Sequence, residues 1–225
     1  AGHCNKIDIT IEPDGETISI EDNGRGIPVD IHPEKKKSAL EIVFTVLHAG
    51  GKFDGSGYEA SGGLHGVGAS CVNALSDKLE VVVHRDGGVF TQSYSRGIPL
   101  TKVERIRDLT NKDKKQGTKV TFHADSEIFK ESIKFDENTI IKKLRETSFL
   151  NKGLTINYFN KATNTKETFF AEGGIADYVK YLTEARTGHY PQNPIYIENA
   201  VPISTGKSVV QIALNYTIED DETII

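Results

Sequence analysis

Strand-like segments of this sequence occur as neighbouring pairs, and helix-like segments stand between the pairs. Residues 7–12 and 16–20 alternate apolar and polar side chains on either side of Pro13-Asp14-Gly15, a combination typical of a β-hairpin. Two further pairs follow the same pattern, residues 79–85 with 89–94 and residues 154–160 with 166–171, and a single strand is predicted near 118–123. This order differs from strict strand–helix–strand alternation. It predicts an α+β fold, a two-layer sandwich of a mixed or antiparallel sheet with helices on one face.

Four segments of the sequence predict helices. Ser38 and Glu41 form a capping box at the start of a helix over residues 38–48. Apolar residues at helical spacing in residues 175–182 mark an amphipathic helix. The other two helices are expected from about His65 to Ser76 and from Asp136 to about Phe149.

The last part of the sequence suggests a change of domain. Residues 188–202 carry three prolines and are interpreted as a connector, and residues 207–217 predict a strand that opens another domain. We therefore expect one domain over residues 1–200 and the truncated start of a second over residues 201–225.

Composition excludes several classes of protein. Net charge is −5, from 27 basic and 32 acidic side chains, so neutralisation of nucleic-acid phosphates is not the main task of this segment. No apolar run approaches the roughly 18 residues that cross a bilayer, and we expect a cytosolic protein. Cys71 stands among small apolar residues and is expected to be a buried thiol. Because the 225 residues include no methionine, we expect a fragment cut from a longer chain.

The first candidate site is Glu21-Asp22-Asn23-Gly24-Arg25-Gly26-Ile27-Pro28, at the end of a predicted strand. Gly24 and Gly26 allow a sharp turn and close approach of a ligand. Asp22 is an acceptor that can take a hydrogen bond from the exocyclic amine of a purine. The alternative is an ordinary surface turn.

The second candidate is Gly62-Gly63-Leu64-His65-Gly66-Val67-Gly68, directly before a predicted helix. Its exposed N–H groups and the helix N-terminus together favour phosphate. The spacing is neither that of a P-loop nor that of a dinucleotide fold, and structural glycines in a flexible loop are the alternative. Lys52, after Gly50 and Gly51, can reach a terminal phosphate or be merely solvated. Thr118 can pair with Asp22 or with a water on the base.

Taken together, Asp22-x-Gly-x-Gly, the second glycine-rich stretch and Gly117-Thr118 resemble the nucleotide site of the GHKL ATPase superfamily. Residues 45–54 and 61–75 are similar to bacterial type II topoisomerases in particular. The resemblance implies a GHKL (Bergerat) fold, followed by the start of a transducer domain similar to domain 2 of ribosomal protein S5.

The same resemblance implies roles for individual residues. Asp22 would bind the adenine amine with the help of Thr118, Ile20, Val43 and Val120 would form pocket walls, and residues 49–63 would be a lid. The full set of expected ATP-binding residues is Asp22, Gly26, Ile27, Gly50, Gly51, Lys52, Tyr58, Gly63, Leu64, His65, Gly66, Val67, Gly68, Ala69 and Thr118. Arg25, Pro28 and Arg85 would form a rim that binds inhibitors.

The family's catalytic base and its Mg²⁺ ligand would precede residue 1, so the resemblance implies no catalytic residue and no metal ligand within this segment. The cofactors implied are ATP and Mg²⁺, and the segment alone is expected to be inactive. The intact protein would be an ATP-dependent DNA topoisomerase. Its expected partners are a second kind of chain in a heterotetramer with two copies of each, double-stranded DNA through the intact complex, and a second ATPase region on ATP binding. A histidine kinase catalytic domain and a non-catalytic nucleotide-binding module are the alternatives.

Overall fold

The computed structural model describes residues 3–48, 66–110, 116–186, 188–203, 206–218 and 224. The chain divides into two compact units, each discontinuous in sequence. The first comprises Ala1–Glu137 with Ile156–Thr168, and the second comprises Asn138–Thr155 with Phe169–Ile225. Within the described ranges, every helix is too short or too polar to span a membrane.

The first unit is built on one large sheet. In the described residues the strand order is β5-β4-β3-β7-β2-β1-β8-β9, and β6 pairs with β4 beside β5. The strands are β1 (Lys6–Ile11), β2 (Thr17–Asp22), β3 (Ser76–Arg85), β4 (Gly88–Ser95), β5 (Ile98–Pro99), β6 (Glu104–Asp108), β7 (Gly117–Ala124), β8 (Thr155–Asn160) and β9 (Thr165–Phe169). The pairs from β1 through β2, β7 and β3 to β4 are all antiparallel. The predicted class, α+β with an antiparallel or mixed sheet, is confirmed.

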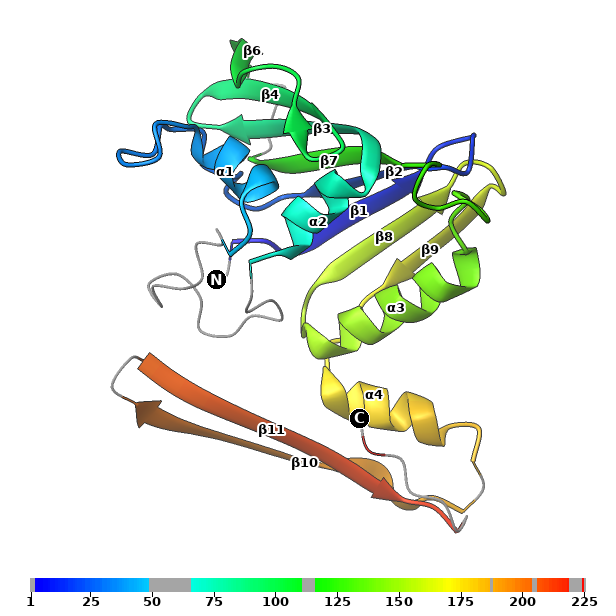
Figure 1. Ribbon diagram of the computed structural model, residues 1–225. Helices are drawn as coiled ribbons and strands as arrows, with labels where there is room; N and C mark the ends of the chain where they lie inside the picture. The colour runs from blue at the N-terminus through cyan, green and yellow to red at the C-terminus, as the bar shows by residue number, and fades with distance from the viewer. Residues whose placement is uncertain are drawn as a thin grey trace. The chain divides into compact units, whose positions relative to one another are not determined.

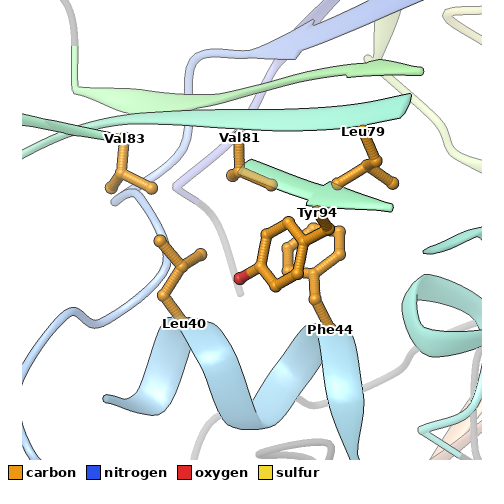
Figure 2. Packing of buried hydrophobic residues seen from close by; sticks show 6 residues of the cluster. All are labelled: Leu40, Phe44, Leu79, Val81, Val83 and Tyr94. Atoms are coloured by element: carbon orange, nitrogen blue, oxygen red, sulfur yellow. The ribbon is translucent and has the colours of Figure 1, made fainter. Parts of the chain in front are cut away.

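Two short helices, α1 (Ala39–Thr45) and α2 (Gly68–Ala74), lie on the same side of this sheet (Figure 1). The predicted cap of α1 is present, since the Ser38 hydroxyl accepts a hydrogen bond from the N–H of Glu41 at 3.0 Å. Leu40 and Phe44 of α1 point toward Leu79, Val81, Val83 and Tyr94 on β3 and β4, as Figure 2 shows. This core fixes α1 on the sheet through apolar burial.

Cys71 contradicts the prediction of a buried thiol, because the structure leaves it exposed. The buried side of α2 carries Ser70 and Asn73, three residues apart, while Ala69 and Val72 are partly buried against the core. Neighbouring positions on a helix point about 100° apart, so Cys71 falls outside the buried stripe. Small apolar neighbours in sequence do not show which face is covered.

The structure contains two strands, β5 and β6, that the sequence analysis does not predict. β5 has only two residues, and every residue of β6 is exposed. Without one buried face, β6 lacks the alternation that reveals a strand in sequence. Only the pairing with β4 makes these segments strands.

The second unit contains helices α3 (Glu137–Leu150) and α4 (Ile175–Thr183) and the antiparallel strands β10 (Tyr190–Ile203) and β11 (Gly206–Tyr216). Aromatic contacts join the two helices. The rings of Phe149 and Tyr178 stack with centroids 4.8 Å apart, and the Arg145 guanidinium lies 5.5 Å from the Tyr181 ring centroid. Such contacts stabilise helix pairs beyond the area they bury.

The prediction of a connector over residues 188–202 is wrong, because most of this segment forms β10. Prolines ordinarily interrupt strands, but this segment forms a strand although it contains three prolines. In a two-stranded sheet each strand has a free edge, where a missing N–H removes no ladder hydrogen bond. Pro191 also lies at the start of the strand, and Pro194 lies in the register irregularity between Tyr190 and Ile195.

Candidate nucleotide-binding site

The register of three adjacent strands assembles one side of the site. On β2 and β7, Ile20 pairs with Val120, and continuing that register sets Asp22 opposite Thr118. On β3 and β7, Val83 pairs with Thr118. Opposed residues in an antiparallel pair point to the same face of the sheet. Asp22 and Thr118 therefore lie in one row with Val83, on the face that α1 covers.

Asp22 carries a half-buried carboxylate at the end of β2. Burial raises its pKa above the ordinary value, and hydrogen bonds from the backbone N–H groups of Gly24 and Thr118 offset part of that effect. The N–H of Gly24 lies 2.8 Å from Oδ1. Among the described residues, no cationic side chain contributes to lowering this pKa. A desolvated carboxylate without a compensating cation is typical of a functional position rather than a structural one.

Two glycines allow the chain to close tightly around this carboxylate. Gly117 has φ +147°, and a Cβ atom there would overlap the carbonyl oxygen of Asp22. Gly26 has φ +74°, and its Cβ would lie 2.8 Å from the carbonyl oxygen of His84. The sequence includes Gly117 in the Gly117-Thr118 motif but predicts no role for it. The structure gives the reason for a glycine there, because the backbone passes directly against Asp22.

The Thr118 side chain is 5% exposed, and its hydroxyl oxygen accepts a hydrogen bond from the N–H of Ile27 at 3.1 Å. That contact occupies an acceptor position of the hydroxyl and leaves its proton free to be donated to a ligand. Arg85 supports the same turn, since its Nη1 donates to the carbonyl of Gly26 at 2.8 Å. The structure thus brings Asp22, Gly26, Ile27 and Thr118 together.

Beside this row, the helix-covered face contains an uncovered apolar position. Ile20 is 37% exposed although it lies in a central strand and points to the same face as the buried Ile18. Its cross-strand neighbour Val120 packs against the core, as does Val43 of α1. An exposed isoleucine beside a desolvated acceptor suits the floor of a pocket for a flat, partly polar ring.

The residues of the predicted inhibitor rim differ in their surroundings. Arg85 is half-buried and contacts the turn at Gly26, whereas Arg25 and Pro28 are both exposed. Arg85 also pairs with Asp86 at 2.7 Å. Its hydrogen bond to Gly26 therefore ties Arg85 to the turn that follows Asp22.

The second predicted element lies at the start of α2. Gly66 has φ +60°, and Val67 occupies the N-cap position without any side-chain hydrogen bond to the helix. The first intrahelical bond that closes this start runs from the N–H of Cys71 to the carbonyl of Val67. The N–H groups of Gly68 and Ala69 precede it and make no hydrogen bond within the described part of the chain, as expected of the first donors of a helix, which favour anions.

The remaining predicted ATP-binding residues lie outside the described residues: Gly50, Gly51, Lys52, Tyr58, Gly63, Leu64 and His65. Their roles stay predictions. In the described part of the chain, no group of three or more His, Cys, Asp or Glu side chains is arranged to hold a metal ion.

Comparison with known proteins agrees with this geometry. Residues 1–128 match the family model of histidine kinase-, DNA gyrase B- and HSP90-like ATPases. Since the match covers more than half of the chain, the chain belongs to this ATPase family.

Curated relatives narrow the comparison within the family. The chain is 48% identical to the DNA gyrase B protein of Thermotoga maritima over 100% of its own length and 35% of that protein. It is 45% identical to the DNA gyrase B protein of Haloferax volcanii over 97% of its length and 33% of that protein. The chain therefore spans about a third of the length of these relatives.

A solved structure shows the same fold. The 43K ATPase domain of Thermus thermophilus gyrase B, in complex with an aminocoumarin, superposes with a TM-score of 0.74 at 34% identity. The match covers 88% of this chain and 48% of that one.

Proposed function

We propose that this chain is an ATP-binding region, and that the intact protein is an ATP-dependent type II DNA topoisomerase of the gyrase B kind. The observation that carries the proposal is the half-buried Asp22 carboxylate, which has a raised pKa and lies in register with Thr118 where β2 ends and β7 begins. The family match and the gyrase B relatives over the whole chain support it.

Adenine is the base that fits the two polar groups. The Asp22 carboxylate only accepts hydrogen bonds and would take one from the exocyclic amine. The Thr118 hydroxyl, which already accepts from Ile27, would donate to a ring nitrogen directly or through a water. Guanine presents an acceptor where adenine presents its amine and a donor where adenine presents a ring nitrogen, so both contacts would be mismatched.

Phosphates would meet the start of α2. The orphan N–H groups of Gly68 and Ala69 and the positive end of the helix dipole both favour negative charge. Lys52, Gly50 and Gly51 would add to this side, as the family resemblance implies. Tyr58 would contact the base.

The test is a calorimetric comparison of ADP and GDP binding to the 225-residue chain. We expect ADP to bind and GDP to bind at least about tenfold more weakly, because an unpaired buried polar group costs about 1–3 kcal/mol. Equal affinity for the two nucleotides would overturn base recognition by Asp22 and Thr118. No binding of either would overturn the proposal as a whole.

Two stretches of sequence bear on which topoisomerase the intact protein is. Residues 144–153 and 172–176 favour gyrase over topoisomerase IV, and the relatives described above are gyrase B proteins. The expected partners are then the DNA gyrase A protein in an A₂B₂ heterotetramer and double-stranded DNA, with dimerisation of the ATPase region on ATP binding. A cytoplasmic location accompanies this role.

Mg²⁺ belongs to the proposal only for the intact protein. In the described residues no acidic cluster fits a metal ion, so we derive no step through one. The predicted division between residues 200 and 201 lies within β10, and the start of a transducer domain over residues 201–225 stays a prediction.

The two alternatives from the sequence have less support. A histidine kinase catalytic domain shares the family, but the relatives at 45–48% identity are gyrase B proteins. A non-catalytic nucleotide-binding module would share the adenine contacts. ATP turnover by the intact protein, measured with and without DNA, separates that module from an ATPase.

A further inference from the structure

Asn73 is a buried polar residue on α2, whereas the proposed base contacts come from β2 and β7. Its side chain has 0% exposure, and Nδ2 donates to the carbonyl oxygen of Phe44 in α1 at 2.8 Å. Its Oδ1 has no hydrogen-bond partner among the described atoms. An unsatisfied buried acceptor is unfavourable, so the hydrogen bond made by Nδ2 calls for an explanation.

The Phe44 carbonyl needs an external donor because α1 stops early. Val46 leaves the helix with φ −118° and ψ 126°, and its own N–H closes the last turn on Ile42. In a longer helix the N–H of His48 would bond Phe44, but His48 has a positive φ of 59°. Asn73 therefore acts as a C-terminal cap of α1 that is supplied by α2.

The same side chain also orients α2. This helix has seven residues, too few to be stable alone. The carbonyls of Asn73 and Leu75 accept from the N–H groups of Gly97 and Asp125, and both bonds hold the C-terminal end of the helix. The hydrogen bond from the Asn73 amide to the Phe44 carbonyl joins α2 to α1 and has a defined direction. Ala69 and Val72 pack this helix against the core, but such apolar contacts are less directional than a hydrogen bond.

We propose that Asn73 is a positioning residue for phosphate binding. By capping α1 it fixes the rotation of α2 and hence the direction of the N–H groups of Gly68 and Ala69. The adenine contacts of Asp22 and Thr118 come from β2 and β7, whereas the Asn73 side chain donates its hydrogen bond to α1. This inference rests on the proposed function and predicts that Asn73 matters for the phosphates and not for the base.

The experiment compares Asn73→Ala with Asn160→Ala in the 225-residue chain. Asn160 is a matched control because it is also buried, donates from Nδ2 to Glu137 at 3.0 Å, and lies at the end of β8. Binding of ADP and of adenosine is measured for each variant by calorimetry, with competition where adenosine is weak. Thermal unfolding is recorded in parallel.

We expect Asn73→Ala to weaken ADP binding by roughly fivefold to thirtyfold, in the upper part of the range of about twofold to thirtyfold for residues that act on a site without touching the ligand. Adenosine binding should change by less than about twofold, because the base contacts are retained. Asn160→Ala should lower the melting temperature and leave the ratio of the two affinities unchanged. A merely structural role of Asn73 would move both ligands together.

Two outcomes overturn the inference and are distinguishable. If the wild-type chain binds ADP and adenosine but Asn73→Ala keeps their ratio, Asn73 is not a positioning residue and the proposed function stands. If the wild-type chain binds neither, the proposed function fails and takes this inference with it. Should Asn73→Ala not fold, Asn73→Ser is judged by the same ratio.

Discussion

Two aspartates beside the two ends of β7 have opposite surroundings. Asp125, just past its last residue, is 2% exposed, pairs with Arg96 at 2.6 Å and accepts from the N–H of Glu127 at 2.9 Å. The hydrogen bond from Arg96 holds its pKa below the usual range. Asp22, opposite the first residues of β7, has a raised pKa caused by burial, and among the described residues the backbone N–H groups of Gly24 and Thr118 offset part of that effect.

The difference separates a structural carboxylate from a ligand-binding one. Asp125 is satisfied by its own chain, and its hydrogen bonds join β7 to the turns around it. The described residues leave acceptor positions of the half-buried Asp22 carboxylate unfilled, which costs stability until a donor binds there. A charge that the fold leaves only partly compensated is better evidence of function than a charge that the fold neutralises.

The largest expected effect is that of Asp22→Asn on nucleotide affinity. The amide keeps the shape but can turn a donor toward the adenine amine, and a hydrogen bond to a charged group contributes about 1.5–3 kcal/mol. We expect ADP affinity to fall by about tenfold to a hundredfold in calorimetric titration.

The same substitution should leave stability unchanged or raise it. Because the folded-state pKa of Asp22 is raised, its linked stability is present in acid and is lost as pH rises through that pKa. At neutral pH the ionised group is therefore a cost that Asn removes. A marked fall in melting temperature with intact ADP binding would place Asp22 in the same structural class as Asp125.

Gly117→Ala is expected to have the next largest effect. The new Cβ would overlap the carbonyl of Asp22, at a φ that side chains rarely adopt. Such strain costs about 1–3 kcal/mol, measured by urea unfolding. Gly15→Ala is the control, since Gly15 also has a positive φ but a Cβ there would have no neighbouring atom within 4 Å. Equal losses in the two variants would show that crowding at Asp22 is unimportant.

Asp125→Asn tests the other aspartate, and we expect it to lower stability without changing nucleotide affinity. Removing the charge leaves Arg96 without its main partner, so thermal unfolding should shift to lower temperature. ADP affinity should stay within about twofold, because distant sites act independently. If affinity falls as much as in Asp22→Asn, the two ends of β7 are coupled and the distinction between them fails.

The smallest expected effect is a pH dependence of stability that is caused by His123, which lies near the same end of β7 as Asp125. His123 Nδ1 lies 2.7 Å from Asp77, and Glu16 lies 3.5 Å from its other ring nitrogen. The hydrogen bond with Asp77 raises the pKa of His123, and burial opposes it. The resulting stability is complete below the unfolded-state pKa of about 6.5 and is lost as pH rises through the folded-state value.

We therefore expect the melting temperature to fall modestly between about pH 6 and pH 8. His123→Gln should flatten that slope without changing ADP binding. A slope that persists in the variant would assign the effect to other groups.

Most residues of the described site could be predicted from the sequence. Asp22, Gly26, Ile27 and Thr118 could be identified because glycine spacing and a strand-end carboxylate are local patterns. Gly117 belongs to a motif found in the sequence, but its role could not be predicted, since the need for glycine comes from a contact with the Asp22 carbonyl on another strand. The role of Asn73 could not be predicted either, because its hydrogen-bond partner Phe44 is 29 residues away in the sequence.

The amino-acid sequence by itself determined the alternation that forms β1 to β4, the cap of α1 and the positions of the glycines. These depend on neighbours within a few residues. Tertiary structure alone decided that β7 lies between β2 and β3, which sets Thr118 beside both Asp22 and Val83. It also decided which face of α2 is buried and made a strand of the proline-containing segment. Pairing register and burial are relations between distant segments, and no local pattern encodes them.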